Sequence, residues 1–146
     1  MRILGINSVY HESAAALVVD GEVLAACEEE RFTRIKHAKE PSPDNPHHLP
    51  EQAIRSCLDQ AGLDAADIDR VAYSFDPRLR RAKLSPDWAP DPSWEATFLR
   101  RLEEIGPAAE KVLARSLRGR LKFVPHHLAH AASAYYPSGC ERAACK

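Results

Sequence analysis

Short apolar runs at the start of the chain alternate with polar turns, a pattern typical of a β-sheet. Arg2–Asn7 and Ala14–Val19 each have the length and composition of a strand. Asp20-Gly21 favours a tight hairpin turn, because both central positions of such a turn prefer a positive φ, so residues 22–27 are expected to return antiparallel. The polar segment 8–13 joins the first two strands. The pattern therefore predicts an antiparallel meander with a polar loop at one end.

Further along, helical and strand patterns alternate. Glu51–Ala61 carries apolar residues at a helical period, and Gly62 supplies the residue that commonly ends a helix. The other expected elements are a buried strand at 70–75, a helix at 94–105 that continues to about 117 after an interruption, and a strand at 121–124. The proline-bearing segments 36–50 and 77–92 are expected to be surface loops. Together these patterns predict an α/β fold with a mixed sheet and flanking helices.

Composition restricts the class of protein. With 45% apolar and 28% charged residues, the 146-residue chain has the composition of a folded soluble domain. A formal net charge of −1 gives no electrostatic reason to expect a nucleic acid or a membrane surface as a partner. The first five residues are those of a strand, not of a signal peptide, and the four cysteines form no C-x-x-C pair. We therefore expect a cytoplasmic protein with reduced cysteines.

A histidine pair follows the last predicted strand. Pro125 ends that strand, and His126 and His130 come four residues apart in a run of helix formers, which places both imidazoles on one helix face. Such a pair can reach one divalent metal ion, although the same spacing also arises by chance. Its place at a strand-to-helix junction favours the ligand hypothesis. Two ligands do not complete a site, and imidazoles suit iron, zinc or nickel equally well.

Two further segments carry candidate chemistry. In the loop 8–13, Ser8 and Ser13 can cradle phosphate, and His11 is either a solvated turn residue or a proton acceptor. An actin-like kinase or ATPase would place an acidic residue near position 7 and glycines in this loop, whereas this chain has Asn7 and no glycine in the loop. In the segment 28–37, the basic residues Arg34, Lys36 and His37 can hold a phosphate or a carboxylate.

Five blocks occur in order along the chain: 5–7 (GIN), 11–15 (HESAA), 20–21 (DG), 28–37 (EEERFTRIKH) and 126–131 (HHLAHA). This series resembles the NodU/CmcH/TobZ-type O-carbamoyltransferases. The resemblance implies an actin-like, Kae1-like domain followed by a YrdC-like domain. It also implies that carbamoyl phosphate and ATP give carbamoyl-adenylate, and that an iron-containing site passes the carbamoyl group to a hydroxyl of a small-molecule acceptor, such as an antibiotic or a nodulation factor.

The resemblance also assigns roles to residues. His126 and His130 correspond to two metal ligands, and an aspartate that completes the set would lie beyond residue 146. His11 and Lys36 correspond to catalytic positions near the carbamoyl group. Glu12, Ser13 and Arg34 fall in the same two blocks and are expected to bind substrate.

The chain is also expected to be incomplete relative to that family. Residues 1–146 correspond to the N-terminal part of the Kae1-like domain, and residues 141–145 are expected to begin a further strand. We therefore expect the chain to be inactive without the C-terminal part of the same enzyme. The alternatives are a non-catalytic gene remnant, an actin-like kinase or ATPase, and a protein of the threonylcarbamoyl-tRNA type, which shares the histidine helix. The block at 28–37 favours the small-molecule carbamoyltransferases.

Overall fold

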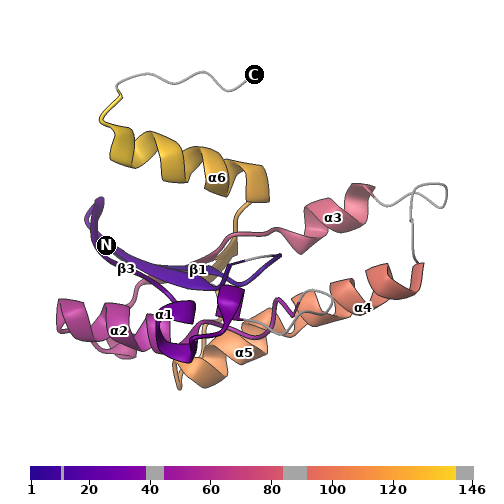
Figure 1. Cartoon of the computed structure of the whole chain (residues 1–146), viewed down its shortest axis with the longest axis horizontal. Coiled ribbons are helices and arrows are strands. Elements are labelled where there is room, and N and C mark those ends of the chain that lie inside the picture. The colour runs from indigo at the N-terminus through magenta and orange to yellow at the C-terminus, as the bar shows by residue number, and fades with distance from the viewer. Residues whose placement is uncertain (11, 39–44, 84–91, 141–146) are drawn as a thin grey trace.

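A single mixed sheet organises the molecule (Figure 1). The computed structural model describes residues 1–10, 12–38, 45–83 and 92–140. Within these residues five strands lie in the order β3-β2-β1-β4-β5. β2 pairs antiparallel with both β1 and β3, whereas β1–β4 and β4–β5 are parallel pairs. The strands are β1 (Arg2–Asn7), β2 (Ala14–Val19), β3 (Glu22–Glu28), β4 (Arg70–Tyr73) and β5 (Leu121–Phe123). The predicted α/β class and the antiparallel meander are confirmed.

The two faces of the sheet differ in side-chain size. Alternate residues of the central strands, such as Leu4, Leu17 and Tyr73, are fully buried on one face. The opposite face carries small residues, among them Gly5 and Ala72. The face with large side chains therefore forms the core, and the face with small ones leaves room above the sheet.

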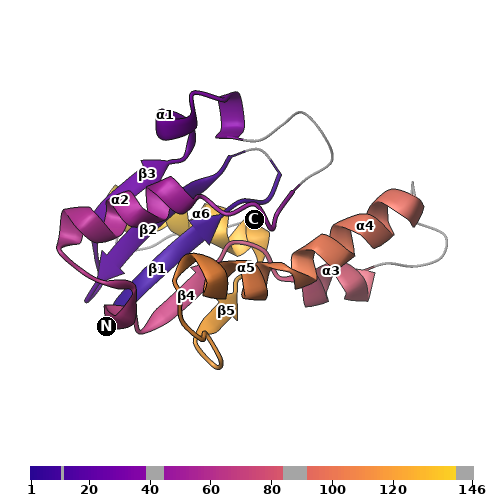
Figure 2. The ribbon, with the colours of Figure 1, turned by 90° about the horizontal axis from the view of Figure 1, so that it is seen from below.

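The helices lie on both sides of the sheet (Figures 1 and 2). They are α1 (Glu30–Thr33), α2 (Glu51–Ala61), α3 (Pro77–Lys83), α4 (Pro92–Glu103), α5 (Ile105–Val112) and α6 (His126–Tyr135), with 3₁₀ turns at Lys36–Ala38, Ala65–Asp67 and Tyr136–Ser138. α2 and α5 cover the core face, and α6 stands alone above the other face. The predicted bounds of α2 are confirmed, as is Gly62 at its end, with φ of 62°.

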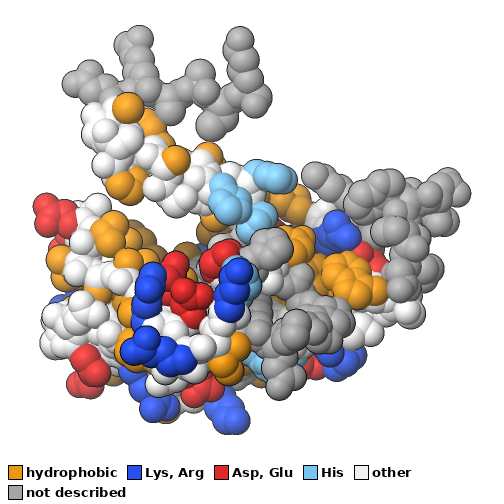
Figure 3. All heavy atoms as spheres, viewed as in Figure 1, with side chains coloured by type: hydrophobic (Ala, Val, Ile, Leu, Met, Phe, Trp, Pro, Cys, Tyr) orange, Lys and Arg blue, Asp and Glu red, His pale blue; other side chains and the backbone are white. Residues whose placement is uncertain are grey.

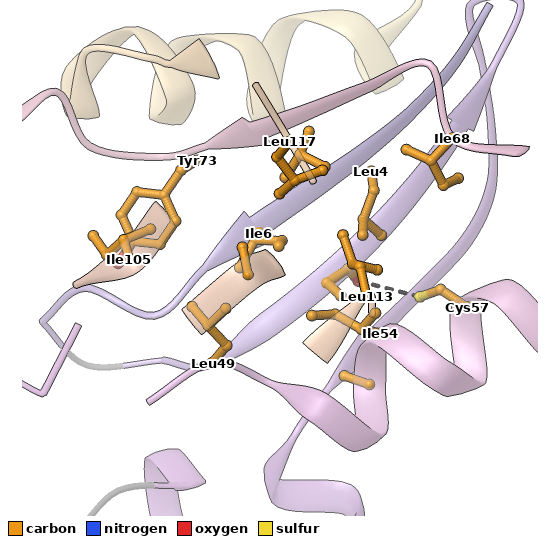
Figure 4. Close-up of a cluster of buried hydrophobic side chains, with 14 of the residues drawn as sticks. Leu4, Ile6, Leu49, Ile54, Cys57, Ile68, Tyr73, Ile105, Leu113 and Leu117 are labelled. Carbon is orange, nitrogen blue, oxygen red and sulfur yellow. Dashed lines mark hydrogen bonds between the residues drawn. The ribbon is translucent and has the colours of Figure 1, made fainter. Parts of the chain in front are cut away.

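The core joins sheet and helices on one side only (Figure 4). Ile54 and Cys57 of α2 pack under the first strands, and the Cys57 thiol donates a hydrogen bond to the Ala15 carbonyl over 3.5 Å. Each aliphatic side chain buried in this way contributes about 1.5–3 kcal/mol to stability. α6 contributes no buried residue to this core.

A carboxylate from a distant segment caps α2. The residue before α2 is Pro50, whose side chain cannot accept a hydrogen bond. Glu29, 7% exposed, accepts hydrogen bonds from the Gln52 amide at 3.2 Å and the Ala53 amide at 2.7 Å. A negative charge at the N-terminus of a helix also interacts favourably with the helix dipole. Glu29 therefore fixes α2 to the end of β3.

The prediction that 77–92 is a loop was wrong for its first part, because 77–83 form α3. Pro77 occupies the first helical position, where it fits, and Asp76 accepts a hydrogen bond from the Arg78 amide over 3.0 Å. The Arg78 guanidinium also binds this carboxylate and lowers the pKa of Asp76. Arg80 forms a two-bond ion pair with the buried Glu95 of α4, at 2.9 and 2.7 Å. Residues 84–91 lie outside the described residues.

Other predicted bounds were too long. β4 ends at Tyr73 rather than at 75, β5 ends at Phe123, and α5 ends at Val112 rather than near 117. In the predicted loop 36–50, residues 39–44 lie outside the described residues, and so does the strand expected at 141–145.

Candidate functional site

An open cleft of about 990 Å³ separates α6 from the small-residue face of the sheet. In Figure 3 the hollow is visible beneath α6, and histidine side chains gather near the beginning of that helix. The sheet contributes small side chains to the floor, including Gly5, Ala14, Ala16, Ala26 and Ala72. α6 contributes His126, Ala129, His130, Ala132 and Ser133. The predicted metal ligands His126 and His130 therefore line this cleft.

His126 and His130 point their Nε2 atoms toward each other across 3.1 Å. Two nitrogen ligands bound to one ion at about 2.0–2.1 Å lie roughly 2.8–3.4 Å apart, for bond angles between 90° and tetrahedral. The pair therefore has the spacing of two neighbouring ligands of a single ion. The helix predicted from the sequence produces this geometry, because residues i and i+4 share one face.

The backbone directly after β4 fixes the orientation of His126. Its Nδ1 lies 3.1 Å from the Ser74 carbonyl, which can only accept, so Nδ1 carries the proton. The lone pair of the neutral ring is then on Nε2, where the His130 Nε2–H donates to it. An Nδ1–H bonded to a carbonyl is the usual partner arrangement of a metal-binding histidine.

The donor set fits part of a metal site. Among the described residues no group of three or more His, Cys, Asp or Glu side chains is arranged to hold a metal ion. Two imidazoles suit borderline divalent ions such as iron, which take four to six donors in all. Among the described residues, His126 and His130 can thus provide only two of these donors.

Asn7 links the loop 8–13 to the histidine helix. Its Oδ1 accepts a hydrogen bond from the Ser74 hydroxyl, and its Nδ2 donates to the Glu12 carbonyl over 2.7 Å. Since the Ser74 carbonyl holds His126, one chain of hydrogen bonds runs from this loop to the histidine pair. The interpretation of Ser8 as a phosphate ligand does not fit, because its buried hydroxyl donates to the Pro46 carbonyl over 2.6 Å.

The structure brings some of the other predicted residues together. Glu12 lines the cleft, and its carboxylate pairs with His37 over 3.3 Å, which joins the two sequence blocks. Ser13 is buried beside Glu12 in a small adjoining depression. Arg34 and Lys36 are exposed and do not line the cleft. His11 lies outside the described residues.

Sequence reasoning missed two residues at the cleft. Tyr10 packs its ring against His126, with centroids 5.2 Å apart, and Ser74 supplies the carbonyl described above. An aromatic side chain in a polar loop and a hydroxyl at the end of a buried strand were the available signals. Neither indicates a partner more than fifty residues away.

Other surfaces are less informative. Cys27, Cys57 and Cys140 are free cysteines. Three arginines of α3 form ion pairs within the chain: Arg78 with Asp76, Arg80 with Glu95, and Arg81 with Glu103. Within the described residues, every helix is too short or too polar to cross a membrane.

Known structures share this fold. YeaZ from Pseudomonas aeruginosa aligns with 96% of this chain and 51% of its own, with a TM-score of 0.50 and 15% identity. A second structure, described as similar to peptidase YEAZ from Pseudomonas aeruginosa, gives a TM-score of 0.51 at 18% identity over 96% of this chain and 50% of its own. The fold is therefore the Kae1-like, actin-like one that the sequence predicted.

Sequence relatives point to one family. Residues 2–101 match the family described as Carbamoyltransferase N-terminus. Nodulation protein NolNO of Sinorhizobium fredii is 38% identical over a region that covers 93% of this chain and 19% of its own length. Protein sll1178 of Synechocystis sp. is 35% identical over a region that covers 97% of this chain and 24% of its own length. A tRNA N6-adenosine threonylcarbamoyltransferase of Pyrobaculum islandicum is 32% identical over a region that covers 54% of this chain and 24% of its own length. The chain thus spans a quarter or less of these relatives. It belongs to the carbamoyltransferase N-terminus family, as the resemblance of its motifs predicted.

Proposed function

We propose that this chain forms the histidine half of the active site of an O-carbamoyltransferase. In the proposed reaction, carbamoyl phosphate, ATP and water give carbamoyl-adenylate, phosphate and pyrophosphate, and a small-molecule acceptor then takes the carbamoyl group on a hydroxyl. The observation that carries the proposal is the 3.1 Å approach of the His126 and His130 Nε2 atoms in a cleft of this family's fold. The portion of the relatives that this chain does not span supplies the rest of the site.

We propose that the metal is iron and that His126 and His130 hold it. When bound, iron would act as a Lewis acid that polarises oxygen atoms of the carbamoyl donor. The chain's own contribution is orientation. The Ser74 carbonyl keeps the proton of His126 on Nδ1, so that Nε2 faces the cleft together with that of His130. Without this carbonyl the ring could present the wrong nitrogen.

The loop 8–13 is proposed to act on the acceptor. Asn7 holds the Glu12 carbonyl, so the loop ends beside the cleft. In the transfer step the acceptor oxygen bonds to the carbamoyl carbon, and the bond from that carbon to the adenylate phosphate breaks. AMP leaves, and we assign the hydroxyl proton to His11, whose imidazole can act as a general base. Lys36 is the second proposed catalytic residue, and Glu12, Ser13 and Arg34 are proposed to bind substrate.

A small-molecule acceptor is favoured over a nucleic acid. One relative is named for a tRNA modification, which makes a tRNA-type function the second candidate. A net charge of −1 and an α3 whose described arginines are paired within the chain give phosphate backbones little to bind. No nucleic acid or membrane partner is therefore proposed. With its free cysteines, the protein is proposed to be cytoplasmic.

A metal titration tests the half-site. Purified wild-type chain and its His126→Ala, His130→Ala and His127→Ala variants would be titrated anaerobically with Fe²⁺ in a calorimeter. His127 is the matched control, because it is the exposed neighbour of His126 and lies outside the cleft lining. Wild type and His127→Ala should bind one ion per chain, and the other two variants should bind at least tenfold more weakly.

The transfer reaction needs the rest of the enzyme. A hybrid would carry this chain in place of the matching segment of the NolNO protein, with carbamoyl phosphate, ATP and a hydroxyl acceptor supplied. Mass spectrometry should detect the carbamoylated acceptor with wild type and His127→Ala and lose it with His126→Ala. An active hybrid that tolerates both His126→Ala and His130→Ala would contradict the proposal.

A further inference from the structure

Two aromatic side chains, Tyr10 and Phe75, contact the His126 ring, and a third, Phe98, packs behind them. The Tyr10 ring meets the His126 ring edge to face, with centroids 5.2 Å apart and planes at 67°. Phe75 lies 6.0 Å from the same imidazole. Tyr10 in turn packs against Phe75 at 5.8 Å and stacks on Phe98 of α4 at 6.0 Å. The His126 ring therefore packs against aromatic side chains that the core holds in place.

The backbone of Tyr10 has an uncommon conformation. Its φ is 61°, in the left-handed region that bulky side chains rarely adopt. Such a conformation persists only where the surroundings over-determine it, and here Phe75 and Phe98 hold the ring. Strain of this kind gathers at ligand sites, because it places a side chain where an ordinary turn would not.

The two histidines are supported unequally. His126 is half-buried, with its Nδ1 bonded to the Ser74 carbonyl and its ring against Tyr10. His130 is exposed and packs its ring on His126 at 4.5 Å. An imidazole held only by one hydrogen bond at Nδ1 can still rotate about that bond. A second ring packed against the side of the imidazole, as Tyr10 is here, prevents this rotation.

We propose that Tyr10 is a positioning residue that holds the His126 imidazole in the orientation in which Nε2 faces His130. This inference rests on the proposed function, in which the pair is the metal half-site. Tyr10 touches no reacting atom in this account. Its ring, not its hydroxyl, has the role, so phenylalanine should replace it and an aliphatic residue should not.

The test compares four variants with wild type: Tyr10→Phe, Tyr10→Leu, Tyr10→Asn and Tyr136→Leu. Asparagine tolerates a positive φ, so Tyr10→Asn removes the ring while easing the backbone strain. Tyr136 is 78% exposed and serves as the control for loss of a tyrosine. Two quantities are measured: Fe²⁺ affinity by anaerobic calorimetry, and the nuclear Overhauser effect between the His126 and His130 rings in the metal-free chain.

Tyr10→Leu and Tyr10→Asn should lose about tenfold in Fe²⁺ affinity and lose the Overhauser effect, whereas Tyr10→Phe and Tyr136→Leu keep both. Wild-type affinity in Tyr10→Leu and Tyr10→Asn would overturn the inference. If wild type binds Fe²⁺ no better than His126→Ala, the proposed metal half-site fails instead. The Overhauser effect still decides the role of Tyr10 in that case: its persistence in Tyr10→Leu and Tyr10→Asn overturns the inference, and its loss supports it.

Discussion

Backbone strain at single residues coincides with the two sequence blocks that carry candidate chemistry. Among the described residues, six other than glycine have a positive φ, and four of them lie in or beside the loop 8–13 and the segment 28–37. These four are Tyr10, Arg34, His37 and Ala38. Each such residue costs of order 1–3 kcal/mol unless the surroundings hold it. The presence of these costly conformations in both segments supports the proposal that the two segments are shaped for binding.

His47 gives the fold a dependence on pH. Burial lowers its pKa from the ordinary value of about 6.5, and the neighbouring His48 lowers it further, against a raising effect of Glu104 at 3.7 Å. A histidine with a lowered pKa in the folded state stabilises the fold above pH 6.5. The free energy of unfolding should therefore fall as the pH drops below about 6.5, by at most about 1.4 kcal/mol per pH unit, and level off below the folded-state pKa.

Urea unfolding of wild type and His47→Gln between pH 7.5 and 5 measures this effect. The variant should lose most of the slope just below pH 6.5, because glutamine has no proton to gain. His48→Gln is the control and should keep a clear slope, since burial of His47, the main cause, is unchanged. Equal slopes in wild type and His47→Gln would show that other groups control the dependence.

Residue spacing within one element was readable from the sequence, and contacts between elements were not. The His126–His130 pair follows from helical periodicity, because both residues belong to one helix. Tyr10 and Ser74 meet His126 only because β1 and β4 are parallel neighbours whose C-terminal ends lie side by side. The sequence contains no local signal for that pairing, so these partners became visible only in the fold.

At the scale of elements, prediction succeeded where periodicity was strong and failed where proline dominated the interpretation. α2 and the first strands match their predicted bounds because their apolar patterns are regular. α3 was missed because Pro77 was taken as a sign of a loop, although Asp-Pro is also a common helix start. The Arg80–Glu95 pair that ties α3 to α4 spans fifteen positions and could not be inferred locally.

Glu29 should control the stability of α2. Glu29→Ala leaves the part-buried amide of Gln52 and the buried amide of Ala53 without an acceptor, which should lower the free energy of unfolding by about 2 kcal/mol. Glu28→Ala is the matched control, because Glu28 pairs with the exposed Arg31 and should cost about 0.5 kcal/mol. Denaturant unfolding of both variants measures the difference. A loss in Glu29→Ala no larger than in Glu28→Ala would mean that water satisfies these amides.

At the scale of the whole molecule, the two sides of the sheet differ in cohesion. The core side joins the sheet to α2, α4 and α5 through fully buried side chains (Figure 4). On the other side α6 lies across an open cleft (Figure 3), and no residue of α6 is buried. A helix held in this way can open without unfolding the core, which suits an element that carries ligands.

Hydrogen exchange can separate these two parts of the molecule. Backbone amides of α6 should exchange at least roughly tenfold faster than those of α2, a helix of similar length whose buried face and Glu29 cap tie it to the core. Equal protection would mean that α6 opens only when the whole chain unfolds. Added Fe²⁺ should slow exchange in α6 and leave α2 unchanged, because an ion bound to His126 and His130 joins two successive turns of that helix. Slowing in both helices would instead indicate that the ion stabilises the fold from another site.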